Sequence, residues 1–183
     1  MEIPILTTDR LVLRPFVLED VEELAVVHSE ESFWWYPLRA GMTMDQTVGF
    51  LVRTIERYES DGFGIEAVID KATGAMIGWA GLAVPHFLPQ ILPAVEVGWR
   101  LSGPYRGRGL ATEAGAAALR WGFTTAGLDR VVSIYEPENV ASGKVMEHLG
   151  LEPYLTATHP ERGETMIVTQ ISAARWRARQ DNG

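Results

Sequence analysis

Tyr105-Arg106-Gly107-Arg108-Gly109-Leu110-Ala111 is the stretch of this 183-residue sequence from which its fold and function class are worked out. It follows a strand-like segment, residues 95–101, and opens a helical pattern that ends near residue 124. Closely spaced glycines between a strand and a helix leave several backbone N–H groups pointing outward at the helix N-terminus. The helix dipole and two arginines add positive charge at the same place. The stretch predicts a phosphate or pyrophosphate site; taken alone, it leaves a tight turn without a ligand as an open alternative.

Two familiar phosphate motifs do not fit this stretch. It contains no Gly-Lys-Ser/Thr, which excludes a Walker-type phosphate loop. Its glycine spacing is not Gly-x-Gly-x-x-Gly, and no acidic residue ends a following strand about 20 residues on, as a dinucleotide fold requires. An ATP-binding domain is therefore a weak alternative.

Composition is that of an ordinary globular protein, with 46% hydrophobic and 22% charged residues. We expect residues 1–183 to form a single domain, with a frayed polar tail at 175–183. No apolar run approaches the ~18 residues needed to span a membrane, and the first residues lack a signal-peptide pattern. A cytoplasmic location and no membrane partner are therefore expected.

The sequence has no cysteine, which rules out disulfides and thiolate metal ligands. Three of its histidines, His28, His148 and His159, are scattered, so we expect no metal site. A net charge of −8 argues against nucleic acid as a partner. An acidic surface suits a cationic substrate such as an amine or basic peptide, although solubility alone also explains it.

The hydrophobic pattern predicts an α+β domain. Strands are expected at residues 11–15, 65–70, 76–84, 95–101, 131–135, 151–158 and 164–171, and helices at 18–28, 44–60, 111–124 and 140–149. Thr43 and Asn139 are expected to cap two of the helices. On the helix after Thr43, the pattern predicts a buried face of Val48, Leu51/Val52, Ile55 and Tyr58.

Several motifs in this order carry a resemblance to a known family. They are Arg106-Gly107-Arg108-Gly109-Leu110-Ala111, which fits the pattern Arg/Gln-x-x-Gly-x-Gly/Ala, and the segments 8–14, 77–82, 96–101, 109–114 and 139–150. The sequence resembles the GNAT superfamily of N-acetyltransferases, and within it the branch of ribosomal-protein N-terminal acetyltransferases (RimJ/RimL-like). The resemblance runs from Thr8 to about Glu152. It implies a mixed, mostly antiparallel sheet of about seven strands flanked by about four helices, and acetyl-CoA as the acetyl donor.

The resemblance assigns cofactor-binding residues by position. The pantetheine arm would contact the backbone of a splayed strand at Val97, Gly98 and Trp99, although a plain core strand with an incidental glycine remains open. Asn139 would contact the same arm, and Lys144 would reach the 3′-phosphate or lie in solvent. The pyrophosphate would be held, mostly by backbone N–H groups, at Arg106, Gly107, Arg108, Gly109, Leu110 and Ala111.

Direct transfer to an amine requires that the amine lose its proton, because an ammonium has no lone pair. Glu96, at the start of the cofactor strand, is the candidate base; a water chain is the alternative. Ser142 would lie near the sulfur and protonate or hydrogen-bond the leaving thiolate; a water, or the low basicity of the thiolate itself, is the alternative. Many relatives use a tyrosine four residues further on, where this chain has Met146. Backbone N–H groups near residues 97–99 would stabilise the developing oxyanion.

The acceptor site is expected between two loops. Phe33, Trp34, Trp35 and Tyr36 would line one wall, unless they form a hydrophobic plug, and His86 and Phe87 the other. The branch resemblance favours a peptide or protein N-terminus as acceptor. A small amine (a polyamine, aminoglycoside or amino-acid-like antibiotic) and a non-catalytic acyl-CoA-binding sensor remain open. A homodimer is possible on the sequence alone.

Overall fold

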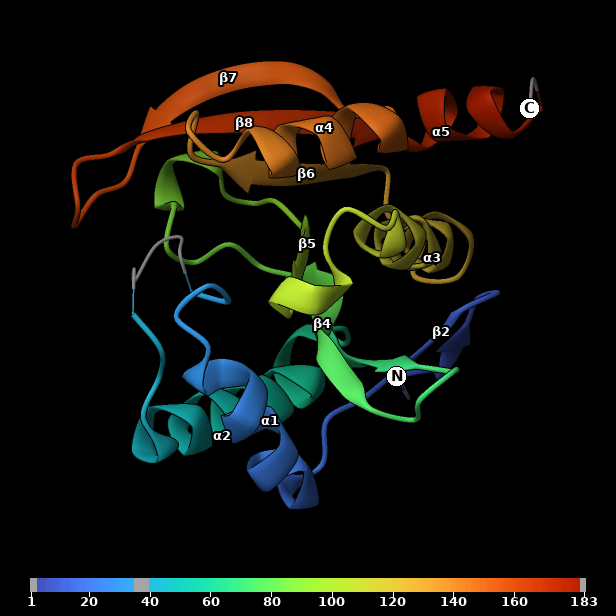
Figure 1. The fold of residues 1–183 in the computed structure, drawn as a ribbon. Coiled ribbons are helices and arrows are strands. Elements are labelled where there is room, and N and C mark those ends of the chain that lie inside the picture. Colours follow the sequence, from blue (N-terminus) through green and yellow to red (C-terminus); the bar gives the residue numbers. More distant parts are fainter. Residues whose placement is uncertain (1–2, 35–39, 182–183) are drawn as a thin grey trace.

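The computed structural model describes residues 3–34 and 40–181. These residues form one eight-stranded sheet with the spatial order β1-β2-β3-β4-β5-β6-β8-β7 (Figure 1). The strands are β1 Leu6–Thr7, β2 Leu11–Arg14, β3 Ile65–Asp70, β4 Met76–Ala83, β5 Glu96–Leu101, β6 Arg130–Tyr135, β7 Glu152–Thr158 and β8 Thr165–Ser172. The predicted mixed, mostly antiparallel α+β sheet is confirmed, with one more strand than expected, because the short β1 pairs with β2.

Helices cover both faces of the sheet (Figure 1). They are α1 Val21–Ser29, α2 Met44–Asp61, α3 Leu110–Thr124, α4 Val140–Leu149 and α5 Ala173–Gln180. On one face, α1 and α2 pack on the first half of the sheet around Phe16, Leu24 and Leu51. On the other face, α3 packs on β2, β4 and β5 through Leu110 and Ala114. None of the helices among the described residues is long and apolar enough to cross a membrane.

The join between β5 and β6 is the irregular place in the sheet. Every other pair of neighbouring strands is antiparallel, whereas β5 and β6 run parallel and share a single bridge, at Glu96 and Val132. The Val132 N–H donates to the Val95 carbonyl at 2.8 Å. Beyond the bridge, the Ser133 hydroxyl, rather than a backbone amide, donates to the Val97 carbonyl at 2.8 Å. The two strands therefore diverge toward their C-terminal ends.

The frayed tail expected at residues 175–183 is wrong for residues 175–180, which belong to α5. Ser172 caps the helix by accepting a hydrogen bond from the Arg175 N–H. The Trp176 ring packs on Phe123 with 5.5 Å between ring centroids. The side chains of Arg175 and Arg179 donate to carbonyls at the end of α4. The tail is ordered by these tertiary contacts, which its polar composition does not reveal.

The predicted buried face of α2 is also wrong in part. Val48 and Val52 are 41% and 37% exposed, whereas Thr47 is fully buried. The Thr47 hydroxyl lies 3.2 Å from the Nδ1 atom of buried His28 on α1. This polar contact lets a threonine face inward and turns the two valines toward solvent. Thr43 and Asn139 do cap α2 and α4 as predicted.

Candidate active site

The turn between β5 and α3 has the geometry of an anion site. Gly107 and Gly109 adopt φ angles of 68° and 76°, a region that favours glycine. The first helical hydrogen bond of α3 runs from the Glu113 N–H to the Gly109 carbonyl at 3.0 Å. Within the described structure, the N–H groups of residues 107–112 donate to no other residue. These amides, at the positive end of a helix, are available to phosphate oxygens.

A clamp formed by Thr8, Arg10 and Glu113 holds this turn from behind. The Glu113 carboxylate accepts hydrogen bonds from the Thr8 hydroxyl, from the Arg10 N–H at 2.8 Å and from the Arg10 Nε at 2.6 Å. Arg10 Nη1 donates to the Arg108 carbonyl at 2.9 Å. Burial alone would raise the pKa of Glu113, but the hydrogen bonds from Thr8 and Arg10 outweigh it and lower the pKa. The clamp therefore ties the start of the chain to the first turn of α3.

The two arginines of the turn point to different places. The Arg106 guanidinium donates from Nε to the Leu101 carbonyl at 2.8 Å and from Nη2 to the Ser32 carbonyl. Arg108 is exposed, and its guanidinium lies 5.6 Å from the centroid of the Tyr105 ring. Arg106 thus serves contacts within the protein, and Arg108 remains at the surface of the turn.

Strand β5 presents an edge beside the diverging β6. Successive residues of a strand direct their N–H and C=O groups to opposite edges. The carbonyls of Val97 and Leu101 accept from Ser133 and Arg106, so Trp99 presents its N–H and C=O on that same edge. The only bridge to β6 lies at Glu96, so this edge of Trp99 is unpaired within the described sheet. It can accept an added extended chain.

Glu96 and Gly98 lie on the face of β5 opposite α3. Val97, Trp99 and Leu101 belong to the clusters packed against α3, so alternation places Glu96, Gly98 and Arg100 on the other face. Glu96 as a whole is partly exposed to solvent, but its carboxyl group is buried. Burial raises the pKa of Glu96 to about 8, although a hydrogen bond from the Ile134 backbone lowers it. Such a carboxylate is a suitable proton acceptor near neutral pH.

Helix α4 begins beside the diverging strands. The Asn139 side chain accepts from the Ser142 N–H at 3.3 Å and caps the helix. Ser142 is half-buried in the first turn, and Lys144 is exposed. Met146 is 2% exposed, and its sulfur accepts from the Thr169 hydroxyl at 3.4 Å. The position at which many relatives have a tyrosine is therefore part of the core in this chain.

Two of the aromatic residues after α1, Phe33 and Trp34, lie in the core. Phe33 and Trp34 are 1% and 6% exposed, and Trp35 and Tyr36 lie outside the described residues. The Arg100 guanidinium lies 4.6 Å from the Trp34 ring centroid and donates to the Phe33 carbonyl at 2.7 Å. His28 packs against both rings, and burial, followed by the charge of Arg100, lowers its pKa to about 4. Phe33 and Trp34 thus anchor this segment to β5.

The opposite loop is more exposed. Phe87 is 41% exposed, and His86 beside it is exposed as well. The Phe87 ring stacks on His159 of the β7–β8 hairpin at 5.9 Å between centroids. Gln90 Nε2 donates to the Thr158 carbonyl at 2.8 Å, which holds the loop to the same hairpin. The loop after β4 is therefore positioned by the far edge of the sheet.

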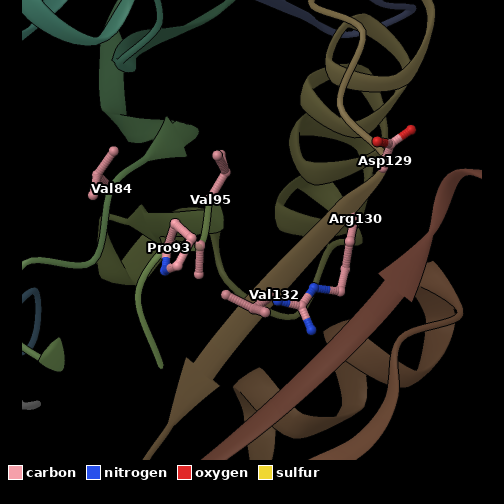
Figure 2. A pocket seen from close by; sticks show the side chains of 7 residues that line it. Val84, Pro93, Val95, Asp129, Arg130 and Val132 are labelled. Atoms are coloured by element: carbon pink, nitrogen blue, oxygen red, sulfur yellow. The ribbon is translucent and has the colours of Figure 1, made fainter. Parts of the chain in front are cut away.

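A cavity of about 360 Å³ opens at the other end of the parallel pair (Figure 2). Its lining includes Val84 at the end of β4, Val95 before β5, and Asp129 and Arg130 at the start of β6. The turn between β5 and α3, residues 102–109, is called the phosphate turn below. It follows the C-terminal end of β5, whereas this cavity lies at the N-terminal ends of β5 and β6. The cavity is therefore separate from the phosphate turn, although two of its lining residues, Val95 and Val132, flank Glu96, which follows Val95 and bridges to Val132.

Comparison with known proteins assigns the family. The acetyltransferase (GNAT) domain matches residues 10–152, and the chain belongs to this family. It is 27% identical over 151 residues to the uncharacterized N-acetyltransferase YoaA of Bacillus subtilis, with 81% of this chain and 83% of the relative covered. The ribosomal protein uS5-alanine N-acetyltransferase of Escherichia coli is 29% identical over 156 residues, with 80% and 77% covered. An acetyltransferase structure from Agrobacterium tumefaciens, 26% identical, aligns with a TM-score of 0.77 over 93% of this chain and 95% of the other.

The protein is an acetyl-CoA-dependent N-acetyltransferase. This confirms the family resemblance and the acetyl donor expected from the sequence. The clamp on Glu113 and the hydroxyl of Ser133 were missed, although Thr8, Arg10 and Glu113 lie within the motifs that carry the resemblance. The contacts of Thr8 and Arg10 with Glu113 join residues 103 or more positions apart, and the contact of Ser133 with Val97 joins residues 36 positions apart; the sequence gives no sign of these pairings.

Proposed function

We propose that the enzyme acetylates the α-amine of a peptide or protein N-terminus by direct attack on acetyl-CoA. The observation that carries this choice is the place of Glu96 at the start of β5, on the strand face opposite α3, where burial raises its pKa to about 8. A base of raised pKa takes a proton more readily from an α-ammonium, whose pKa is about 8, than from a lysine-like ammonium, whose pKa is about 10.4.

The described residues fit acetyl-CoA at several points. The free amides of residues 107–112 and the exposed Arg108 would bind the pyrophosphate, with Gly107 and Gly109 allowing close approach. The unpaired edge at Trp99 would bind the pantetheine arm, with Val97 and Gly98 beside it. Among the described residues, a Cβ at Gly98 would meet only Trp79, at 3.8 Å, so their packing does not require glycine there. The remaining contacts would come from Leu110, Ala111, Asn139 and Lys144, while Arg106 would hold the turn through its bonds to the Leu101 and Ser32 carbonyls.

In the reaction, acetyl-CoA supplies a thioester carbonyl that the neutral amine attacks. Glu96 would take the proton of the amine as the new C–N bond forms. Amides on the Trp99 edge of β5 would donate to the carbonyl oxygen as it becomes negative. Ser142, half-buried at the start of α4, would donate a hydrogen bond to the sulfur as the C–S bond breaks, and the thiolate would then take its proton from water. Met146 has no proton to give and is buried, which leaves this role to Ser142.

The acceptor would approach from the face that carries Glu96. Phe33 and Trp34 flank Arg100 on that face, and His86 and Phe87 lie on the loop that precedes β5. Trp35 and Tyr36 follow in sequence outside the described residues. The relative from Escherichia coli that acetylates ribosomal protein uS5 supports a protein N-terminus as the acceptor class.

An acceptor screen tests the proposal. The enzyme is incubated with acetyl-CoA and a panel of free-N-terminus peptides, their N-blocked counterparts, polyamines and aminoglycosides, and products are identified by mass spectrometry. The proposal predicts acetylation of free peptide α-amines and none of the blocked counterparts. Acetylation confined to small amines would refute it. Tight binding of acetyl-CoA without any product would indicate a non-catalytic acyl-CoA sensor.

A further inference from the structure

The segment that follows α1, residues 30–34, forms hydrogen bonds with the phosphate turn as well as with β5. The Glu30 carboxylate accepts from the Ser102 hydroxyl at 2.6 Å and from the Gly103 N–H at 3.2 Å. Arg106 Nη2 donates to the Ser32 carbonyl. Ser102, Gly103 and Arg106 directly precede the amides proposed to bind phosphate. Residues 30–34 and the turn therefore share a set of hydrogen bonds.

Arg106 stands at the centre of this connection. Its own N–H donates to the Gly103 carbonyl at 3.2 Å, which closes the short helical turn Gly103–Tyr105. Its side chain then joins two carbonyls, those of Leu101 and Ser32, which lie on different segments of the chain. The planar, forked guanidinium can do this with separate N–H groups, whereas a lysine ammonium offers a single point of charge. The side chain thus bridges the turn and residues 30–34.

Residues 30–34 in turn border the proposed acceptor face. Phe33 and Trp34 cover Arg100, which lies on the same face of β5 as Glu96. Arg100 and Glu96 are four residues apart, or about 13 Å along the strand. The same segment therefore contacts the phosphate turn at Ser32 and the acceptor face at Trp34.

We propose that Arg106 is a positioning residue that couples cofactor binding at the turn to the order of residues 30–34 beside the acceptor face. This inference rests on the proposed phosphate site. Phosphate bound to the amides of residues 107–112 would restrict the turn, and the bridge from Arg106 to the Ser32 carbonyl would pass that restriction to residues 30–34. Ordering one segment by ligand binding at another is a coupling between sites, typically about 5- to 150-fold.

Hydrogen exchange with coenzyme A as the probe measures this coupling. The amides of Phe33 and Trp34 are suitable reporters, because they donate to the carbonyls of Glu30 and Glu31 within the segment. In the wild-type protein at saturating coenzyme A, we expect slower exchange both at residues 107–112 and at these two reporters. In Arg106→Gln, exchange at residues 107–112 should still slow, and exchange at Phe33 and Trp34 should respond at least fivefold less.

Arg108→Gln is the matched control, because it removes a neighbouring cation that makes no bridge to residues 30–34. It should weaken coenzyme A binding and, at saturation, keep the slowed exchange at Phe33 and Trp34. Arg106→Lys keeps the positive charge without the forked guanidinium, and it should also lose the response at Phe33 and Trp34. This variant tests the proposal if Arg106→Gln does not fold. Unchanged coupling in the Arg106 variants would overturn the proposal. Wild-type protein that binds coenzyme A without protecting residues 107–112 would overturn the phosphate site itself, and the coupling with it.

Discussion

The clamp behind the phosphate turn allows a prediction with a definite sign. Glu113 lies in the first turn of α3, about 5 Å along the helix axis from the turn. Its carboxylate lies behind the turn proposed to bind pyrophosphate and is matched by Arg10 at 2.6 Å. Removing Arg10 leaves an unmatched negative charge close to the bound phosphates. Arg10→Ala should therefore weaken coenzyme A binding, and the additional change Glu113→Gln should restore most of it.

The size of this effect follows from the charges and their exposure. Two unit charges about 8 Å apart interact by about 2 kcal/mol at an effective dielectric constant of about 20. Arg10 is 49% exposed, so solvent screening reduces this value. A remaining effect of about 1 kcal/mol corresponds to a dissociation constant about five times larger. The double variant should return to within about twofold of the wild type.

Isothermal titration calorimetry with coenzyme A measures these dissociation constants. Pantetheine, which lacks the pyrophosphate and the nucleotide, serves as the control ligand and should bind all variants alike. The reasoning is refuted if the double variant binds coenzyme A no better than Arg10→Ala. Equal losses for pantetheine and coenzyme A would show that Arg10 supports the whole fold and not the phosphate site.

Three further predictions concern the site and the core. The Glu96 carboxyl must lose its proton to act as a base, and its pKa is about 8, so kcat/KM should rise with pH up to about 8. Glu96→Gln should remove this rise of kcat/KM with pH without loss of coenzyme A affinity. Glu66 is 3% exposed, and burial raises its pKa to about 8, above the value in the unfolded chain. The free energy of unfolding should therefore fall as pH rises from about 5 to 8. In thermal melts, the melting temperature of Glu66→Gln should fall less steeply over the same pH range. Met146→Tyr should destabilise the core by about 1–3 kcal/mol in urea unfolding, because Met146 is 2% exposed and packs in one buried cluster with Val97 and Leu149.

Local features of the fold could be predicted from the sequence. The cap at Thr43 depends on residues within one helical turn, and glycines at 107 and 109 are typical of a backbone with positive φ angles. Features that depend on distant contacts could not be predicted. The burial of Thr47 in place of Val48 follows from its contact with His28, and the order of α5 follows from the packing of Trp176 on Phe123.

The candidate site divides in the same way. Spacing places Glu96 and Gly98 on one face of a strand, and the structure agrees, since α3 packs on the other face. The family pattern marks Arg106 as the first residue of the motif, but the sequence does not show whether the guanidinium of Arg106 or of Arg108 is held by the protein. Only the fold shows that one bridges Leu101 and Ser32 while the other stays at the surface.

The most direct test of the account uses one peptide that offers both kinds of amine, a free N-terminus and a single lysine. The peptide is incubated with enzyme and acetyl-CoA near pH 7.5, and fragmentation mass spectrometry locates the acetyl group. The account predicts that the acetyl group lies on the α-amine, with the lysine unmodified, and that Glu96→Gln makes the same product much more slowly. Acetylation of the lysine at a comparable rate would contradict the match between Glu96 and an α-amine on which the proposed function rests.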